Sequence, residues 1–148
     1  IKGKEFNSRG TLKVDYRENG EEKHVFQQVK VIKLDDWEEL KNLKKIDFIK
    51  IDVEGNEMQT LRGAKNMIEK FRPTLMVEME QRHHQEPLYQ LISEIENWGY
   101  QPYFLNRKTF ELENLGENLI ANLSQNFIDS KETYINNIIF IPKNHKTQ

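Results

Sequence analysis

The sequence has no cysteine among its 148 residues. A disulfide framework, a zinc–thiolate site and a thiol nucleophile are therefore excluded within the chain. Because nothing in it calls for an oxidising compartment, we expect a cytoplasmic protein.

An excess of charge of one sign is also absent, as is any long apolar run. The chain carries 22 basic and 24 acidic residues and has a net charge of −2. That balance gives no basis for a nucleic-acid or anionic-membrane surface. No apolar stretch approaches the roughly 20 residues of a membrane span. We therefore expect neither nucleic acid nor a membrane as a partner.

The length suits one domain, and hydrophobic patterning predicts the elements of its first part. Strands are expected over residues 11–17 and 24–34, joined either as a hairpin or by a short loop around Asn19 and Gly20. A short helix should follow, with Asp36 as its N-cap and Glu39 completing a capping box.

The remainder of the chain alternates strands with helices. Residues 46–53 are isoleucine-rich and bounded by breakers, as central strands are. A helix capped by Asn56 should run to residue 71, where Arg72 and Pro73 stop it. Further strands are expected over 74–80, 100–105 and 136–143, a helix over 87–99 and a loop over 106–134. The apolar positions expected to face the core are Met58, Leu61, Ala64, Ile68, Phe71, Leu88, Leu91, Ile92, Ile95, Trp98, Phe104 and Phe140.

This order predicts an α/β fold. Strands separated by helical crossovers form parallel sheets with right-handed connections. The last two strands share no helix, so we expect them to form an antiparallel pair at the edge of the sheet.

Acidic residues and histidines follow two neighbouring strands of the predicted sheet. Asp52 and Glu54 stand at the carboxyl end of the first, and Glu78 and Glu80 at that of the next, before His83 and His84. Ligands of open α/β sheets bind beyond these ends. The convergence predicts a ligand site there.

Each of these residues also has a purely structural interpretation. Lys50 shares a strand face with Asp52, so we expect it to lie partly inside and to need a carboxylate partner, either Asp52 or Glu78. Asp52 either binds a ligand or acts as a base, or it only caps the following helix. Glu54 lies beside the amino-terminal end of that helix, where the positive end of the helix dipole favours an anion. Gly55 supplies a backbone shape that a side chain would forbid.

The two histidines are either a general base and its neighbour or exposed loop residues. An imidazole titrates near neutrality and suits a base. Metal-ligand spacing such as HExxH is missing from the sequence, so we do not predict a metal site.

Residues 46–80 closely resemble the FkbM-type methyltransferase family. The strand IKIDVEG, the helix pattern E-x-x-x-L-R-G-A and the strand RPTLMVE stand in the family's order, and VKVIKLDDW upstream is also similar. The resemblance implies a Rossmann-like sheet that uses S-adenosyl-L-methionine to methylate a hydroxyl of a small molecule, a sugar or natural product. It implies Asp52 and Glu54 as cofactor-binding residues and Asp52 or His83 as the catalytic base. The substrate-binding residues it implies are Glu54, Glu78, Glu80 and His84.

The sequence departs from the family in one respect. The family's fold holds the cofactor with a glycine-rich loop after its first strand and a carboxylate ending its second, and the seven glycines here include no G-x-G after a strand. We therefore expect residues 1–148 to be the carboxyl-terminal part of one methyltransferase domain, with strands or an insert over 1–34 and a β-α-β-α-β-β core over 46–143.

Such a truncated sheet would bind the cofactor poorly, leave the isolated fragment inactive and expose a strand edge. Two other functions stay open: a non-catalytic α/β interaction module, and a metal-dependent hydrolase that uses the same carboxylates.

Overall fold

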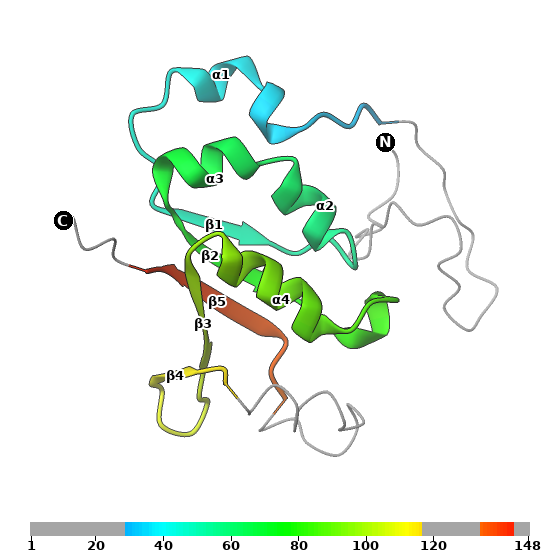
Figure 1. Cartoon of the computed structure of the whole chain (residues 1–148), viewed down its shortest axis with the longest axis vertical. Coiled ribbons are helices and arrows are strands. Elements are labelled where there is room, and N and C mark those ends of the chain that lie inside the picture. The colour runs from blue at the N-terminus through cyan, green and yellow to red at the C-terminus, as the bar shows by residue number, and fades with distance from the viewer. Residues whose placement is uncertain (1–28, 117–133, 144–148) are drawn as a thin grey trace, which may run out of the picture. The chain divides into compact units, whose positions relative to one another are not determined.

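The structure is a computed structural model that describes residues 29–116 and 134–143. The chain divides into two compact units, Ile1–Val31 and Ile32–Gln148. Of the first unit only residues 29–31 are described, and they belong to no helix or strand. The described elements all lie in the second unit and are labelled in Figure 1.

The described elements largely follow the predicted order. Residues 29–34 contain no strand, so that part of the strand predicted over 24–34 is wrong, and the rest of the two amino-terminal strands lies outside the described residues. In chain order the elements are η1 Leu34–Asp36, α1 Glu38–Lys41, β1 Phe48–Ile51, α2 Glu57–Arg62, α3 Lys65–Phe71, β2 Thr74–Glu78, η2 Gln81–His83, α4 Leu88–Asn97, β3 Tyr100–Leu105, β4 Leu112–Asn114 and β5 Asn137–Pro142.

The strands form one mixed five-stranded sheet in the order β1-β2-β5-β3-β4. β1 pairs with β2 in parallel, while β5 pairs antiparallel with both β2 and β3. β1, β2 and β3 therefore run in the same direction, as their helical crossovers predicted. The α/β class is confirmed.

The predicted antiparallel pairing of the last two long strands is confirmed, but their predicted place at the edge is wrong. β5 lies between β2 and β3. Its run of apolar residues, with Ile138 and Phe140 buried, fits a strand that has partners on both sides.

The edge position belongs instead to β4, which lies in the stretch predicted to be loop. Leu105 pairs with Leu112 across the β3–β4 ladder. The Asn106 side chain closes the turn by accepting a hydrogen bond from the Lys108 amide at 2.8 Å. Asn106, the first residue of the predicted loop, thus lies in the turn of a hairpin.

The core lies between the sheet and the helices. Figure 1 shows α2, α3 and α4 in front of the sheet. Most of the predicted apolar positions are fully buried; Phe71, Trp98 and Phe104 are partly buried and pack against the core. On the opposite face of the sheet, Met76, Ile139 and Ile141 are only half-buried.

The single helix predicted to end at residue 71 is two helices, separated at Gly63 and Ala64. Asp35 holds this junction: its carboxylate accepts the Asn66 and Met67 amides at 3.0 and 2.9 Å. It thereby caps α3, whose own N-cap residue, Ala64, makes no side-chain cap bond.

The capping box predicted from Asp36 and Glu39 is wrong. Asp36 lies within η1, and α1 begins after Trp37 without a side-chain cap bond. Asn56 does stand at the start of α2, but its side chain makes no cap bond either. The predicted stop at Arg72 and Pro73 is confirmed, with Arg72 in the left-handed region at φ 51°.

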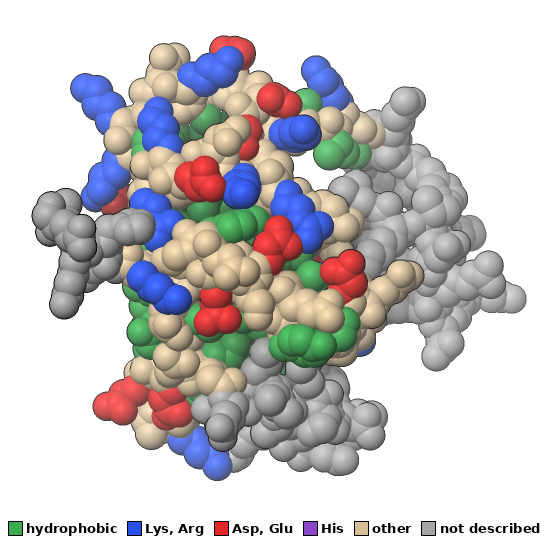
Figure 2. All heavy atoms as spheres, viewed as in Figure 1, with side chains coloured by type: hydrophobic (Ala, Val, Ile, Leu, Met, Phe, Trp, Pro, Cys, Tyr) green, Lys and Arg blue, Asp and Glu red, His purple; other side chains and the backbone are tan. Residues whose placement is uncertain are grey.

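The surface carries both signs of charge. Figure 2 shows basic and acidic side chains interspersed over the pictured face. Among the described helices, none combines the length and the apolar character needed to cross a membrane.

Candidate functional site

The carboxyl ends of β1 and β2 lie side by side, as the sequence predicted. Ile51 is paired with Val77 in the parallel register. Asp52 and Glu78 follow that pair directly, so both carboxylates stand at the same end of the sheet. The placement on which the candidate site depends is therefore confirmed.

Lys50 bridges the two strands. Its Nζ lies 3.5 Å from a carboxylate oxygen of Asp52 and 3.5 Å from one of Glu78. The sequence left these two partners as alternatives, and the structure has both. Lys50 is exposed rather than partly inside, because β1 has β2 as its only neighbour among the described strands.

The turn after β1 has an uncommon backbone. Glu54 has φ 50° and Gly55 has φ 92°, so two successive residues lie in the left-handed region. The role predicted for Gly55 is confirmed, since a side chain there would be strained. A glutamate in this region costs about 1 to 2 kcal/mol and persists only where its surroundings hold it.

Two imidazole–carboxylate pairs join this turn to the turn after β2. His83 Nε2 lies 3.0 Å from Glu54 Oε2, and His84 Nε2 lies 3.0 Å from Glu57 Oε2. The outer pair, His83–Glu54, lies nearer the surface, because the Glu54 side chain is partly exposed. The inner pair, His84–Glu57, is buried, with side chains 8% and 2% exposed.

Glu57 is the residue that the sequence analysis missed. It is the first residue of α2, and its Oε1 accepts the Gly55 amide at 2.8 Å. Burial by itself raises the pKa of Glu57, but pairing with His84 and the Gly55 amide bond outweigh burial and lower it. The signal was present, since this glutamate opens the family pattern E-x-x-x-L-R-G-A.

Glu80 is also buried, with 6% of its side chain exposed. It pairs with the Arg82 guanidinium and accepts the Tyr134 hydroxyl at 3.0 Å. Burial raises the pKa of Glu80, and these two partners lower it by more. The pKa of Tyr134 is raised, by burial first and then by its bond to Glu80.

Glu78 faces the start of β5. Its Oε1 accepts the Asn136 side-chain amide at 3.1 Å, in addition to the contact with Lys50. Sequence reasoning could not identify Asn136 or Tyr134, because only the placement of β5 beside β2 brings them here. A ligand-binding role for Glu78, Glu80 or His84 stays a prediction.

The arrangement offers anionic hydrogen-bond acceptors and an oriented imidazole at one strand end. Asp52 is the most open of these carboxylates, with half of its side chain exposed. Over residues 29–116 and 134–143, no three histidine, aspartate or glutamate side chains stand in positions to hold one metal ion together. The site is thus equipped for binding hydroxyl groups and for accepting a proton.

A family model described as "Methyltransferase FkbM domain" matches residues 3–102. That span includes β1, β2, the turns that follow them and α4. No curated protein and no solved structure gives a match.

Proposed function

The chain belongs to the FkbM methyltransferase domain family, and on that premise we propose that its strand-end site serves methyl transfer from S-adenosyl-L-methionine to a hydroxyl oxygen of a sugar or natural product. The convergence of Asp52, Glu54 and His83 within the matched span carries the proposal. We also propose that the sheet is part of a Rossmann-like one, a reading supported by the common direction of β1, β2 and β3.

The chemistry asked of these residues is modest. The cofactor's sulfonium supplies an already activated methyl group, so the protein has to orient the acceptor and remove its proton. His83 presents Nε2 to Glu54 at 3.0 Å. When Nε2 carries the hydrogen, Nδ1 is the atom left to accept a proton.

In this proposal His83 is the base, Glu54 orients its ring, and Asp52 accepts a hydrogen bond from the acceptor hydroxyl. Neutral imidazole is available as a base near pH 7. The competing assignment makes Asp52 the base, and the two assignments predict different pH profiles.

The described residues fit only part of the cofactor. The carboxylates of Asp52 and Glu54 offer acceptor oxygens for its hydroxyl or ammonium groups. The sequence has no G-x-G turn after a strand, and backbone amides of such turns are what usually holds a cofactor of this kind. We propose that these 148 residues alone bind the cofactor weakly. Calorimetry should detect no micromolar binding by the 148-residue chain, and micromolar binding would contradict this part of the proposal.

The activity itself is tested on the longest protein that the gene encodes. Transfer of labelled methyl from S-adenosyl-L-methionine is measured against a panel of sugars and other hydroxyl compounds. The wild type should label an acceptor, with kcat rising through an acidic limb as imidazole loses its proton. His83→Gln should lose at least 100-fold in kcat together with that limb, while Glu69→Gln, an exposed change on α3, should leave both unchanged. No labelling of any acceptor and no cofactor binding would reject the methyltransferase proposal.

A second candidate function is a non-catalytic module that completes its sheet with another chain. β1 has one neighbour among the described strands, and its Phe48 is 54% exposed. Open strand edges are templates for pairing. Light scattering separates the two: the module should self-associate or bind a partner through β1, and Phe48→Lys should abolish that association.

A further inference from the structure

We propose that Glu57 and His84 are positioning residues: their buried pair fixes the turn after β2 against the turn after β1 and so holds the His83 ring against Glu54. This rests on the proposed function for its consequence in catalysis. The pairing and its effect on His83 stand on geometry alone.

Glu57 is buried, with 2% of its side chain exposed. Its Oε2 has no hydrogen-bond partner among the described residues, and the charge partner beside it is the His84 ring, whose Nε2 lies 3.0 Å away. A buried carboxylate is unfavourable unless it is paired. An apolar side chain of similar size would pack in the core without this cost. The charge of Glu57 therefore points to a role other than packing.

The His84 ring is not needed to shape its own turn. The Gln81 side chain already holds that backbone: its Nε2 donates to the carbonyls of His84 and Glu86 at 3.2 and 3.1 Å, and its Oε1 accepts the Leu88 amide at 3.0 Å. What the His84 ring adds is therefore an attachment across to α2.

The turn after β2 is attached to the turn after β1 at two points. His84 has extended backbone, at φ −119° and ψ 138°, so neighbouring side chains leave the chain in different directions. His83 reaches Glu54 and His84 reaches Glu57, on either side of the left-handed Gly55. Two attachments prevent the rotation of the turn after β2 that a single attachment would allow.

The inner pair can hold the outer one more firmly than the reverse. Glu57 is anchored by the Gly55 amide and by burial, whereas Glu54 is partly exposed to solvent. Glu80 also lies close enough to His83 for their charges to interact, so the His83 ring should report any change in its position.

The experiment records the ring ¹⁵N chemical shifts of the histidines at fixed pH, by long-range ¹H–¹⁵N NMR on the 148-residue chain, which has four histidines. Glu57→Gln keeps the shape and removes the charge. We expect the ring shifts of His84 to change, because the carboxylate 3.0 Å from its Nε2 is replaced by an amide. The ring shifts of His83 should change as well, whereas Glu54→Gln should change only those of His83. Glu69→Gln should change neither.

Unchanged ring shifts of both histidines in a folded Glu57→Gln protein would overturn the proposal, as would His83 ring shifts that respond only to Glu54→Gln. Should Glu57→Gln fail to fold, His84→Gln replaces it, and unchanged His83 ring shifts there overturn the proposal equally. In the methyl-transfer assay, Glu57→Gln should lower kcat and leave KM for S-adenosyl-L-methionine within twofold. If the ring shifts behave as expected and no protein form transfers methyl, the proposed function fails and the pairing stands.

Discussion

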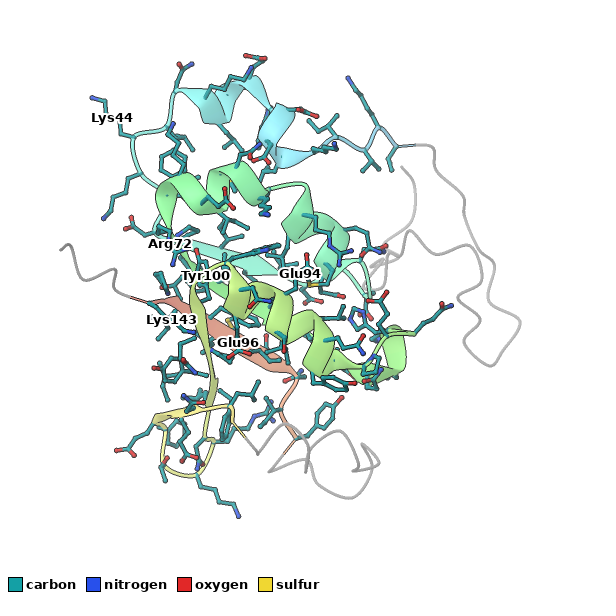
Figure 3. All side chains as sticks on the ribbon, viewed as in Figure 1. Lys44, Arg72, Glu94, Glu96, Tyr100 and Lys143 are labelled. Atoms are coloured by element: carbon teal, nitrogen blue, oxygen red, sulfur yellow. The ribbon has the colours of Figure 1, made fainter. Side chains whose placement is uncertain are left out.

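Arg72 joins the ends of α3 and α4, and its removal gives a sharp test of the packing. Its two terminal guanidinium nitrogens donate to the carbonyls of Trp98 and Gly99, both at 2.6 Å. The guanidinium also lies over the Tyr100 ring, 4.5 Å from its centroid, and Figure 3 shows the two side chains together. Because Tyr100 is fully buried, this contact closes one end of the core.

The magnitude follows from these contacts. Hydrogen bonds to a charged group contribute about 1.5 to 3 kcal/mol each, and stacking on an aromatic ring adds about 0.5 to 1 kcal/mol at a partly exposed site. Since water replaces part of the two bonds, we expect Arg72→Ala to lower the free energy of unfolding by about 3 kcal/mol. That is a large share of the roughly 5 to 15 kcal/mol of a small domain.

The backbone supplies an internal comparison. Arg72 has φ 51°, a conformation that costs a residue with a side chain about 1 to 2 kcal/mol. Arg72→Gly loses the same contacts but relieves this strain, so it should be about 1 kcal/mol more stable than Arg72→Ala. Arg72→Lys keeps the charge without the two-pronged geometry and should fall between Ala and wild type.

Urea unfolding of the 148-residue chain, followed by tryptophan fluorescence, measures all three variants. Lys44→Ala, a change at an exposed cation on the loop before β1, is the matched control and should stay within about 0.5 kcal/mol of wild type. The reasoning is refuted if Arg72→Ala is equally close to wild type, or if Arg72→Gly is the less stable of the two small variants.

Three further predictions concern the acidic residues. Under the proposed function, Asp52→Asn in the longest protein that the gene encodes should lower methyl-transfer turnover by orders of magnitude without changing the urea midpoint, and unchanged turnover would remove Asp52 from the mechanism. Burial raises the pKa values of Glu57 and Glu80, but the interactions with His84 and with Arg82 outweigh it, so both pKa values are lower in the folded chain than in the unfolded one. Both residues therefore stabilise the fold above the ordinary glutamate pKa and lose this contribution as pH falls through their folded values. Urea midpoints should drop over that acidic range, less steeply in Glu80→Gln; equal slopes would argue against the Glu80 contribution. Asp35→Ala should cost about 1 to 2 kcal/mol by uncapping α3, whereas the neighbouring Asp36→Ala should cost almost nothing; equal losses in urea would contradict the capping assignment.

The sequence predicts the site edge well because the signals there are local. A few consecutive residues are enough to predict an isoleucine-rich strand that is bounded by breakers and has carboxylates at its end. β1 and β2 both fall inside the predicted ranges. The left-handed turn at Gly55 is equally local, since only glycine takes that backbone readily.

What sequence reasoning missed depends on contacts between distant segments. Asp35 looks like a surface residue of its own turn until α3 is brought beside it. β5 looks like an edge strand until its place between β2 and β3 is known. Local patterning sets element type, whereas strand order is set by which buried faces must be covered on both sides.

Four acidic residues of the site fall into two groups that differ in burial. This difference reduces the number of carboxylates that can face a ligand. The inner carboxylates, Glu57 and Glu80, are buried and already matched by His84 and by Arg82 with Tyr134. The outer ones, Asp52 and Glu54, keep about half of their surface open. A buried paired charge holds neighbouring groups in place, because moving it would leave a charge unmatched. The inner group therefore fixes the turns, and under the proposed function binding and proton transfer fall to the outer carboxylates and His83.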